Sequence, residues 1–186
     1  MNKYKLLLFL SVIFSINSCK DSGRKTDISK VLTEWIGKEI QFPDNVPCFV
    51  SGHDTIEHLC CDNLQKEYKI LLFVDSTGCS ECRLKLLEWK QLIIEADRLF
   101  QGKVGFLFFF QPKNVIEMKY MFYQNKFIHP VFIDIKLEIN VLNNFPLEQQ
   151  YQCFLLDNEN KVLVIGNPVM NPKIWELFKI QISRGK

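Results

Sequence analysis

Residues 70–82 read Ile70-Leu71-Leu72-Phe73-Val74-Asp75-Ser76-Thr77-Gly78-Cys79-Ser80-Glu81-Cys82. Ile70 and the four large apolar residues after it predict a strand buried on both faces, over residues 67–75. A helical pattern follows the cysteines and extends to about Phe100. The carboxyl end of a central strand, followed by the start of a helix, is where α/β proteins place their chemistry. We therefore expect the functional site at Cys79 and Cys82.

The spacing of these two cysteines suits thiol chemistry. Two intervening residues at a helix start bring both sulfurs onto one turn, close enough to form a disulfide. The first cysteine would meet unpaired amides and the positive end of the helix dipole, which favour its thiolate. We assign Cys79 as the nucleophile and Cys82 as the resolving residue of disulfide exchange. The charge of Glu81 opposes a strongly lowered thiolate pKa, so the direction of electron flow stays open.

Two other interpretations of the pair are a structural disulfide and half of a zinc site. A zinc site needs further close ligands, and the candidates are His58 and the adjacent pair Cys60 and Cys61. Adjacent residues rarely supply both remaining tetrahedral ligands. The sequence therefore predicts no metal site and no cofactor.

The rest of the chain alternates strands and helices. Helices are expected from Ser29 to Gly37 and over residues 112–127, 136–143 and 172–182; strands are expected over residues 104–110, 130–134, 152–156 and 161–165. Short extended segments at residues 41–43 and 47–50, with a turn at 51–54, predict an N-terminal hairpin. Parallel crossovers followed by a terminal hairpin predict an α/β fold in three layers, with a central mixed sheet and helices on both faces.

The N-terminus has the anatomy of a signal peptide. Lys3 and Lys5 precede an apolar run of about 11 residues, too short for the roughly 20 that span a membrane. The sequence before Cys19 resembles a bacterial lipobox, which implies cleavage after residue 18 and lipidation of Cys19. Residues 19–28 then form a polar flexible tether, and residues 29–186 form the domain. An uncleaved short anchor, or a secretory signal with Cys19 there by chance, are the alternatives. We expect lipid anchoring in the cell envelope, and Lys20 favours the outer membrane.

Composition and charge agree with a single globular domain. The chain of 186 residues is 47% apolar and has 16 Phe against 8 Gly. Removal of residues 1–18 leaves 21 basic and 21 acidic residues. Basic residues form no dense run, so we expect no nucleic-acid partner. Attachment to a membrane would come from acyl chains rather than from charge.

Two stretches carry a resemblance to a known family. Residues 73–82 resemble the active-site segment of thioredoxin-like thiol–disulfide oxidoreductases. Phe154-Leu155-Leu156-Asp157-Asn158-Glu159-Asn160-Lys161-Val162 resembles the hairpin of their membrane-tethered, peroxiredoxin-like branch. The resemblance covers roughly residues 35–184 and implies a thioredoxin-like fold with an N-terminal extension.

The resemblance also implies which residues surround the dithiol. Gly78, Ser80 and Glu81 flank the sulfurs, and Gly78 stands where the family often has an aromatic residue. The family places a cis-proline before the hairpin strand, facing the dithiol, and Tyr151 occupies that position here. Cys153 lies in the strand expected beside the dithiol, as a core residue or a third redox thiol.

The leading functional hypothesis is an envelope thiol–disulfide oxidoreductase that exchanges disulfides with exported proteins; its upstream redox partner is unknown. One alternative is a non-catalytic binding lipoprotein whose Cys79 and Cys82 form a static bridge. Another is a peroxiredoxin-like thiol peroxidase, suggested by Ser76 three residues before Cys79, although Leu72 stands where that motif has proline.

The remaining cysteines and histidines are interpreted as structural. Cys48 could pair with Cys60 or Cys61 and staple the expected hairpin. His53, His58 and His129 are scattered, which is typical of surface or loop positions.

Overall fold

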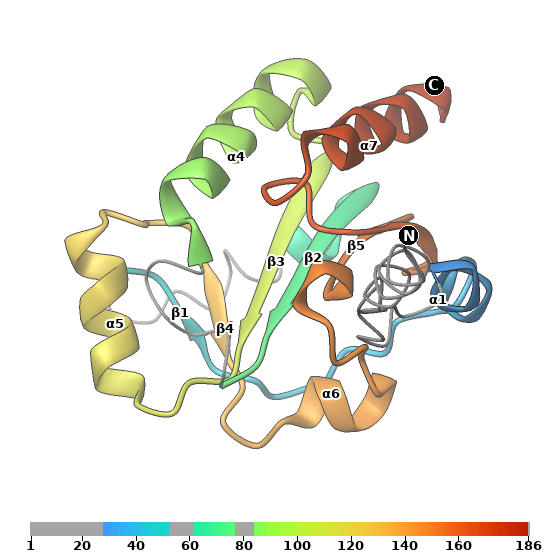
Figure 1. The fold of residues 1–186 in the computed structure, drawn as a ribbon. Helices are drawn as coiled ribbons and strands as arrows, with labels where there is room; N and C mark the ends of the chain where they lie inside the picture. Colours follow the sequence, from blue (N-terminus) through green and yellow to red (C-terminus); the bar gives the residue numbers. More distant parts are fainter. Residues whose placement is uncertain (1–27, 53–61, 77–83, 186) are drawn as a thin grey trace, which may run out of the picture.

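The structure of the protein, a computed structural model, describes residues 28–52, 62–76 and 84–185. The described part contains a six-stranded sheet in the order β1-β4-β3-β2-β5-β6 (Figure 1). The strands are β1 (Cys48–Phe49), β2 (Tyr68–Val74), β3 (Val104–Phe110), β4 (Val131–Ile133), β5 (Cys153–Leu156) and β6 (Val162–Ile165). The helices are α1 (Ile28–Trp35), α4 (Leu86–Phe100), α5 (Val115–Gln124), α6 (Glu138–Asn143), α7 (Pro172–Arg184) and a short 3-10 turn, η1 (Gln149–Tyr151).

Strand β2 lies at the centre of the sheet, as its apolar sequence predicted. It pairs in parallel with β3 along its whole length and antiparallel with β5. All seven of its residues are buried. The sheet is mixed, because β3 and β4 continue the parallel section while β1 and β6 pair antiparallel with their neighbours.

Helices cover both faces of the sheet, and each face has its own hydrophobic core. On one face α4, α5 and α7 pack through Trp89, Phe122 and Phe178 onto alternate strand residues. On the other face α1 and α6 pack through Trp35 and Ile139. This three-layer arrangement confirms the predicted α/β class.

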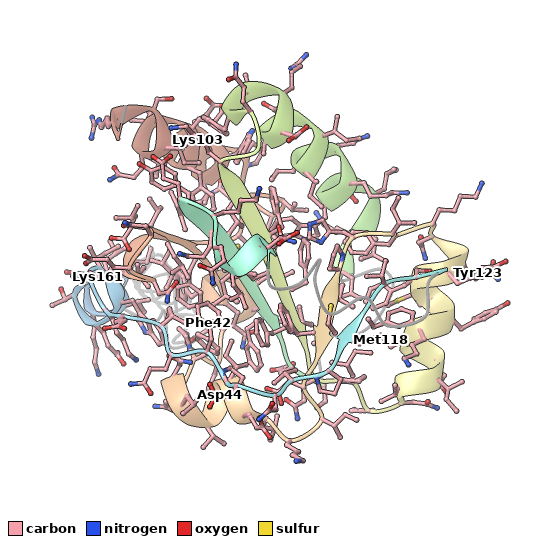
Figure 2. The ribbon with its side chains drawn as sticks, turned by 180° about the vertical axis from the view of Figure 1, so that it is seen from behind. Phe42, Asp44, Lys103, Met118, Tyr123 and Lys161 are labelled. Carbon is pink, nitrogen blue, oxygen red and sulfur yellow. The ribbon has the colours of Figure 1, made fainter. Side chains whose placement is uncertain are left out.

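Side chains fill the space between sheet and helices when the molecule is seen from behind (Figure 2). Met118 of α5 is buried against the sheet, whereas Tyr123 on the same helix points outward and is exposed. Side-chain caps fix where two helices begin: the Asn114 carboxamide oxygen accepts from Ile116 and Glu117, and that of Asn171 accepts from Lys173. No helix within the described ranges is both long enough and apolar enough to cross a membrane.

The helical pattern expected to extend from the cysteines to about Phe100 is confirmed from Leu86 onward, and it is interrupted at Lys85. Leu84 is helical, but Lys85 adopts a left-handed conformation with φ 49° and ψ 49°, and α4 begins only at Leu86. A left-handed residue turns its peptide groups away from the i to i−4 ladder and ends the helical run. The Trp89 N–H then donates to the Lys85 carbonyl oxygen (3.1 Å) and closes the first turn of α4.

Strand β1 lies at one edge of the sheet and pairs with β4, with Cys48 opposite Phe132. The second strand of the expected N-terminal hairpin would fall mainly on residues 53–61, outside the described residues, so the hairpin stays a prediction. Cys48 is disulfide-bonded. Cys153 is free. The predicted pairing of Cys48 with Cys60 or Cys61 involves residues outside the described ranges and stays a prediction.

Candidate functional site

The predicted dithiol lies between two elements that the structure describes. Cys79 and Cys82, with Gly78, Ser80 and Glu81, fall within residues 77–83 and are outside the described residues, as is Cys19. The described chain ends on one side at Asp75 and Ser76, directly after β2, and resumes on the other side at Leu84. The described residues on both sides, up to Ser76 and from Leu84, therefore define the surroundings of the predicted site.

The carboxyl end of β2 is held by hydrogen bonds to two neighbouring segments. The Phe73 N–H donates to the Gln152 carbonyl oxygen (2.9 Å), and the Gln111 N–H donates to the Val74 carbonyl oxygen (2.9 Å). Because buried main-chain groups are paired on both sides, the position from which the dithiol segment departs is fixed.

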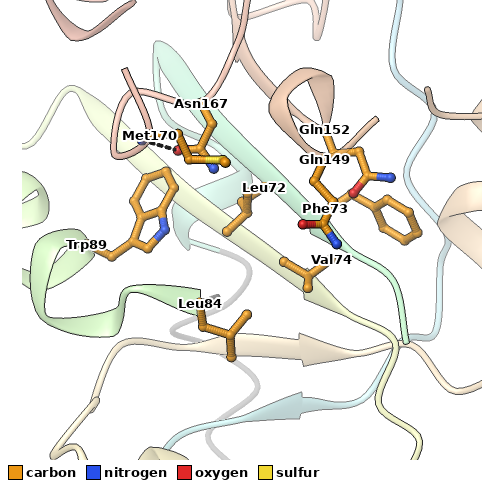
Figure 3. A pocket seen from close by; sticks show the side chains of 9 residues that line it. All are labelled: Leu72, Phe73, Val74, Leu84, Trp89, Gln149, Gln152, Asn167 and Met170. Atoms are coloured by element: carbon orange, nitrogen blue, oxygen red, sulfur yellow. Dashed lines mark hydrogen bonds between the residues drawn. The ribbon is translucent and has the colours of Figure 1, made fainter. Parts of the chain in front are cut away.

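A small hollow opens beside this strand end (Figure 3). One wall is apolar and comes from β2 and α4, where Trp89 packs edge-on against Phe108 with ring centroids 5.2 Å apart. The hollow is lined by Leu72, Phe73, Val74, Leu84, Trp89, Gln149, Gln152, Asn167 and Met170. Its volume is about 30 Å³, enough space to hold ordered water. Taken alone, the described lining is too small to hold an organic ligand.

The other wall of the hollow carries carboxamides. Gln152 is buried, and its Nε2 donates to the Pro146 carbonyl oxygen (2.8 Å), which fixes the turn before β5. The Gln149 side chain is directed toward the hollow (Figure 3). Asn167 accepts from the main-chain N–H groups of Val169 and Met170 through its Oδ1. The sequence analysis missed Gln149, Asn167 and Met170. The glutamines directly before β5, at positions 149, 150 and 152, were the available signal for Gln149.

Tyr151, the residue expected to face the dithiol, does not line this hollow. It is half-buried at the end of η1 and packs against the core on the α1 face of the sheet. The structure thus places glutamine carboxamides, rather than the tyrosine ring, at the wall beside the end of β2.

Cys153 lies opposite Leu72 in the sheet register, so it is next to the strand that leads to the dithiol. Its side chain is nevertheless fully buried in the core on the α4 face. Burial raises the pKa of its thiol far above the ordinary value, because the buried thiolate would lose its hydration. The group is held as a neutral thiol in the folded protein.

A second cavity lies on the far side of the same strand end. It has a volume of about 290 Å³ and is bounded by Ser76 and by residues at the start of α5, including Lys113, Glu117 and Met121. Ser76 therefore lies at the surface between β2 and α5.

The described residues contain no group of three or more His, Cys, Asp or Glu side chains that could hold a metal ion. His53 and His58 fall outside the described residues. His129 contacts the rings of Phe106 and Phe108, and its Nδ1 lies 2.9 Å from the Pro130 carbonyl oxygen. Desolvation lowers the pKa of His129 to about 4, so its imidazole is neutral at pH 7.

Comparisons with known proteins identify the fold. No family model matches the chain, and no curated protein matches it in sequence. Among solved structures, a thiol-disulfide oxidoreductase from Bacteroides fragilis aligns with a TM-score of 0.54 at 15% identity, over 75% of this chain and 99% of that one. A mutant of PrxQ from Xylella fastidiosa aligns with a TM-score of 0.52 at 14% identity, over 81% and 97%. Peroxiredoxin Q of Xanthomonas campestris aligns with a TM-score of 0.51 at 14% identity, over 76% and 92%.

Similarity at this level of identity establishes architecture and not activity. The chain has a thioredoxin-like α/β fold, which confirms the fold implied by the sequence resemblance. Its structural neighbours include both thiol–disulfide oxidoreductases and peroxiredoxins.

Proposed function

We propose that this protein is a thiol–disulfide oxidoreductase of the bacterial cell envelope that acts through Cys79 and Cys82. The observation that carries the proposal is the place of the CxxC motif in the chain. It lies between the carboxyl end of the central strand β2 and the helix α4 of a thioredoxin-like fold. Two sulfurs that are two residues apart at this position suit dithiol exchange.

The proposed reaction transfers two electrons between the dithiol and an exported protein. The Cys79 thiolate attacks one sulfur of a client disulfide, the client S–S bond breaks, and its other sulfur leaves as a thiolate. Cys82, as a thiolate, then attacks the Cys79 sulfur of the mixed disulfide and releases the client's second sulfur. The client is reduced, and Cys79 and Cys82 become a disulfide. A second dithiol protein must reduce that disulfide for another turnover.

Exported proteins are proposed as clients because the sequence predicts both export and a dithiol. At the hollow beside the end of β2, the Gln149 carboxamide can donate to and accept from a peptide backbone. The Gln152 Nε2 and the Asn167 Oδ1 already form hydrogen bonds within the chain.

We further propose that the protein is a lipoprotein held by acyl chains on Cys19, with residues 1–18 removed and the domain facing the periplasm or the cell exterior. The sequence Ile16-Asn17-Ser18-Cys19, the apolar run before it and the polar tether after it support this. Replacement of Cys19 by Ser should move the protein from the membrane fraction to the soluble fraction and remove the diacylglycerol mass. Unchanged fractionation and mass would overturn lipidation.

A trapping experiment tests the oxidoreductase proposal. The Cys82→Ser variant should accumulate mixed disulfides with envelope proteins, because the resolving thiol is missing, whereas Cys79→Ser should trap none. A redox titration of the wild-type domain should give a dithiol potential above about −300 mV, outside the range of inert structural disulfides. A lower potential together with an absence of trapped partners would instead support a static bridge in a binding protein.

Peroxide consumption separates exchange from peroxidase activity. A purified oxidoreductase should reduce an insulin disulfide in the presence of a dithiol reductant, while consuming hydrogen peroxide no faster than the Cys79→Ser variant. Rapid Cys79-dependent peroxide consumption would favour the peroxidase alternative.

A further inference from the structure

Lys85, directly before α4, has a backbone conformation that is unusual for its residue type. Its φ of 49° and ψ of 49° are left-handed. A residue with a β-carbon disfavours this conformation, because the β-carbon comes too close to the following carbonyl oxygen. The Lys85 side chain is exposed, so its own packing does not explain the conformation. The surrounding fold must impose it.

The two neighbours of Lys85 supply the reason. Leu84 and Leu86 are each 4% exposed, and both belong to the core on the α4 face of the sheet. In a continuous α-helix each residue turns the chain by about 100°, so residues two positions apart point in nearly opposite directions. One core could not then bury both leucines. The left-handed Lys85 redirects the chain between them, which allows both side chains to be buried.

The break at Lys85 also decides where the positive end of α4 lies. The first main-chain N–H groups of α4, which have no acceptor within the helix, are those of Leu86, Leu87 and Glu88. Glu88 in this first turn supplies the negative charge that a helix start favours. The dipole effect falls off within the first turn. Both cysteines precede Lys85 in the chain, so neither belongs to the first turn of α4.

Contacts with other elements hold α4 in place. Trp89 is 1% exposed and packs edge-on against Phe108 of β3. The Lys90 ammonium donates to the Asn125 carbonyl oxygen (2.9 Å), at the C-terminal end of α5. Since α4 is fixed in this way, the direction in which the preceding segment joins it depends on the backbone of Lys85.

We propose that Lys85 is a positioning residue for the dithiol: its left-handed backbone keeps the positive end of α4 from stabilising the Cys79 thiolate. The inference rests on the proposed exchange at Cys79 and Cys82, and it assigns the direction of electron flow. A stabilised thiolate favours the reduced form and makes a disulfide a stronger oxidant. Without that stabilisation the dithiol gives its two electrons more readily to a client disulfide. The charge of Glu81 acts in the same direction.

Two substitutions at one position test the proposal. Lys85→Gly permits the left-handed conformation without strain, whereas Lys85→Ile disfavours it because its side chain branches at the β-carbon. Both variants lack the ammonium, so they separate backbone conformation from charge. The purified proteins are equilibrated in glutathione buffers, and their free thiols are alkylated and counted by mass spectrometry. Lys85→Gly should keep the wild-type equilibrium constant. The Lys85→Ile disulfide should be reduced more readily, by about three- to tenfold.

A second pair of variants serves if Lys85→Ile does not fold. Leu86→Gln removes the need to bury residue 86 and lets the helix continue through Lys85, so its disulfide should also be reduced more readily than that of the wild type. Leu87 is 60% exposed, and Leu87→Gln should therefore keep the wild-type equilibrium constant. Wild-type values in both Lys85→Ile and Leu86→Gln would overturn the proposal.

The pH profile of Cys79 gives a test that leaves position 85 unchanged. In reduced Cys82→Ser protein, iodoacetamide should alkylate Cys79 with the pH dependence of a free cysteine peptide. Introduction of Lys85→Ile into this protein should move the profile to lower pH, and Lys85→Gly should not. Alkylation of Cys79 that is already maximal at about pH 6 with Lys85 present would overturn the proposal, since it requires a strongly stabilised thiolate.

Failure of the proposed function gives a different result, because the redox equilibrium needs no client. If Cys82→Ser traps no envelope protein while Lys85→Ile and Lys85→Gly still differ in their equilibrium constants, exchange with exported clients is rejected and the role of Lys85 stands. If clients are trapped but the two variants have equal constants, the role of Lys85 alone is rejected.

Discussion

At the scale of single residues, burial decides which thiols can react. Cys153 is fully buried and its pKa is raised, so the thiolate needed for reaction is scarce in the folded state. Iodoacetamide at pH 8 should leave Cys153 unmodified in native protein and alkylate it in urea, as measured by mass spectrometry of its peptide. Equal alkylation in both conditions would contradict the described burial. As a control, Cys153→Ala should keep the rate of disulfide exchange.

A second residue-scale prediction concerns the pH dependence set by His129. Its folded-state pKa of about 4 lies below the ordinary value of 6.5 because the ring is desolvated among phenylalanines. Below pH 6.5 the unfolded chain takes up a proton that the folded chain excludes. The free energy of unfolding should therefore fall as the pH drops from 6.5 to 4, by about 1–3 kcal/mol.

The His129→Phe variant provides the control for this pH effect, since its ring does not titrate. Urea unfolding of both proteins across this pH range should show a smaller acid loss in the variant, because other groups titrate equally in both. If both proteins lost the same free energy of unfolding over this pH range, His129 would not be the source of the acid effect.

At the scale of elements, α1 is an integral part of the fold rather than an appendage. Trp35 is 2% exposed, and its ring lies 5.7 Å from Phe145 and 5.0 Å from Phe154, measured between centroids. Trp35→Ala should lower the free energy of unfolding by about 3–5 kcal/mol, since it leaves a large cavity. Leu32→Ala, at an exposed position of the same helix, should cost under about 1 kcal/mol. Similar small losses in both variants would contradict the packing of α1.

Gly105 of β3 packs directly against the main chain of Asn63, so this contact requires a residue without a side chain. A β-carbon on Gly105 would overlap the Asn63 main-chain oxygen, and Asn63 Oδ1 accepts from the Phe106 N–H (3.2 Å). Gly105→Ala should therefore destabilise the protein by more than about 2 kcal/mol in urea unfolding. Gly37→Ala has free space but a φ of +81°, so it should cost only about 1 kcal/mol. If Gly105→Ala lowered the free energy of unfolding less than Gly37→Ala, the segment that contains Asn63 would be able to move away from β3.

The elements themselves could largely be predicted from the sequence, and their exceptions have physical reasons. Unbroken apolar runs located β2 and β3, and the polar turn at residues 157–160 marked the hairpin of β5 and β6. The break at Lys85 could not be predicted, because lysine favours helix and only the fold imposes its left-handed conformation. The burial of Lys69 in β2 could not be predicted either, because lysine is usually exposed. Its ammonium donates to the Asn158 carbonyl oxygen (3.2 Å).

The candidate site was predictable in part. The sequence located the dithiol between strand and helix, but it could not show that Tyr151 packs against the core on the α1 face and does not line the hollow. Asn167 and Met170 come from a loop that is distant in sequence from the cysteines, so only the folded chain brings them to the hollow.

At the scale of the whole molecule, the disulfide of Cys48 links stability to redox conditions. Cys48 belongs to the two-residue edge strand β1, which pairs with β4 alone among the described strands. A reductant should lower the free energy of unfolding by about 2–4 kcal/mol, and Cys48→Ala should do the same without further loss on reduction. The double variant Cys79→Ser, Cys82→Ser should keep the reductant effect in urea unfolding. If reductant did not change the free energy of unfolding of the double variant, the effect would come from Cys79 and Cys82 instead.

Helices α1 and α7 each combine buried and accessible apolar positions, and this has an evolutionary consequence. Val31 and Trp35 support the core and tolerate little change, whereas Leu32 and Leu177 are accessible and cost little to replace. Substitutions at the accessible positions can therefore accumulate without loss of folding. Related chains can therefore differ in the surface that these two helices present while they keep the same scaffold.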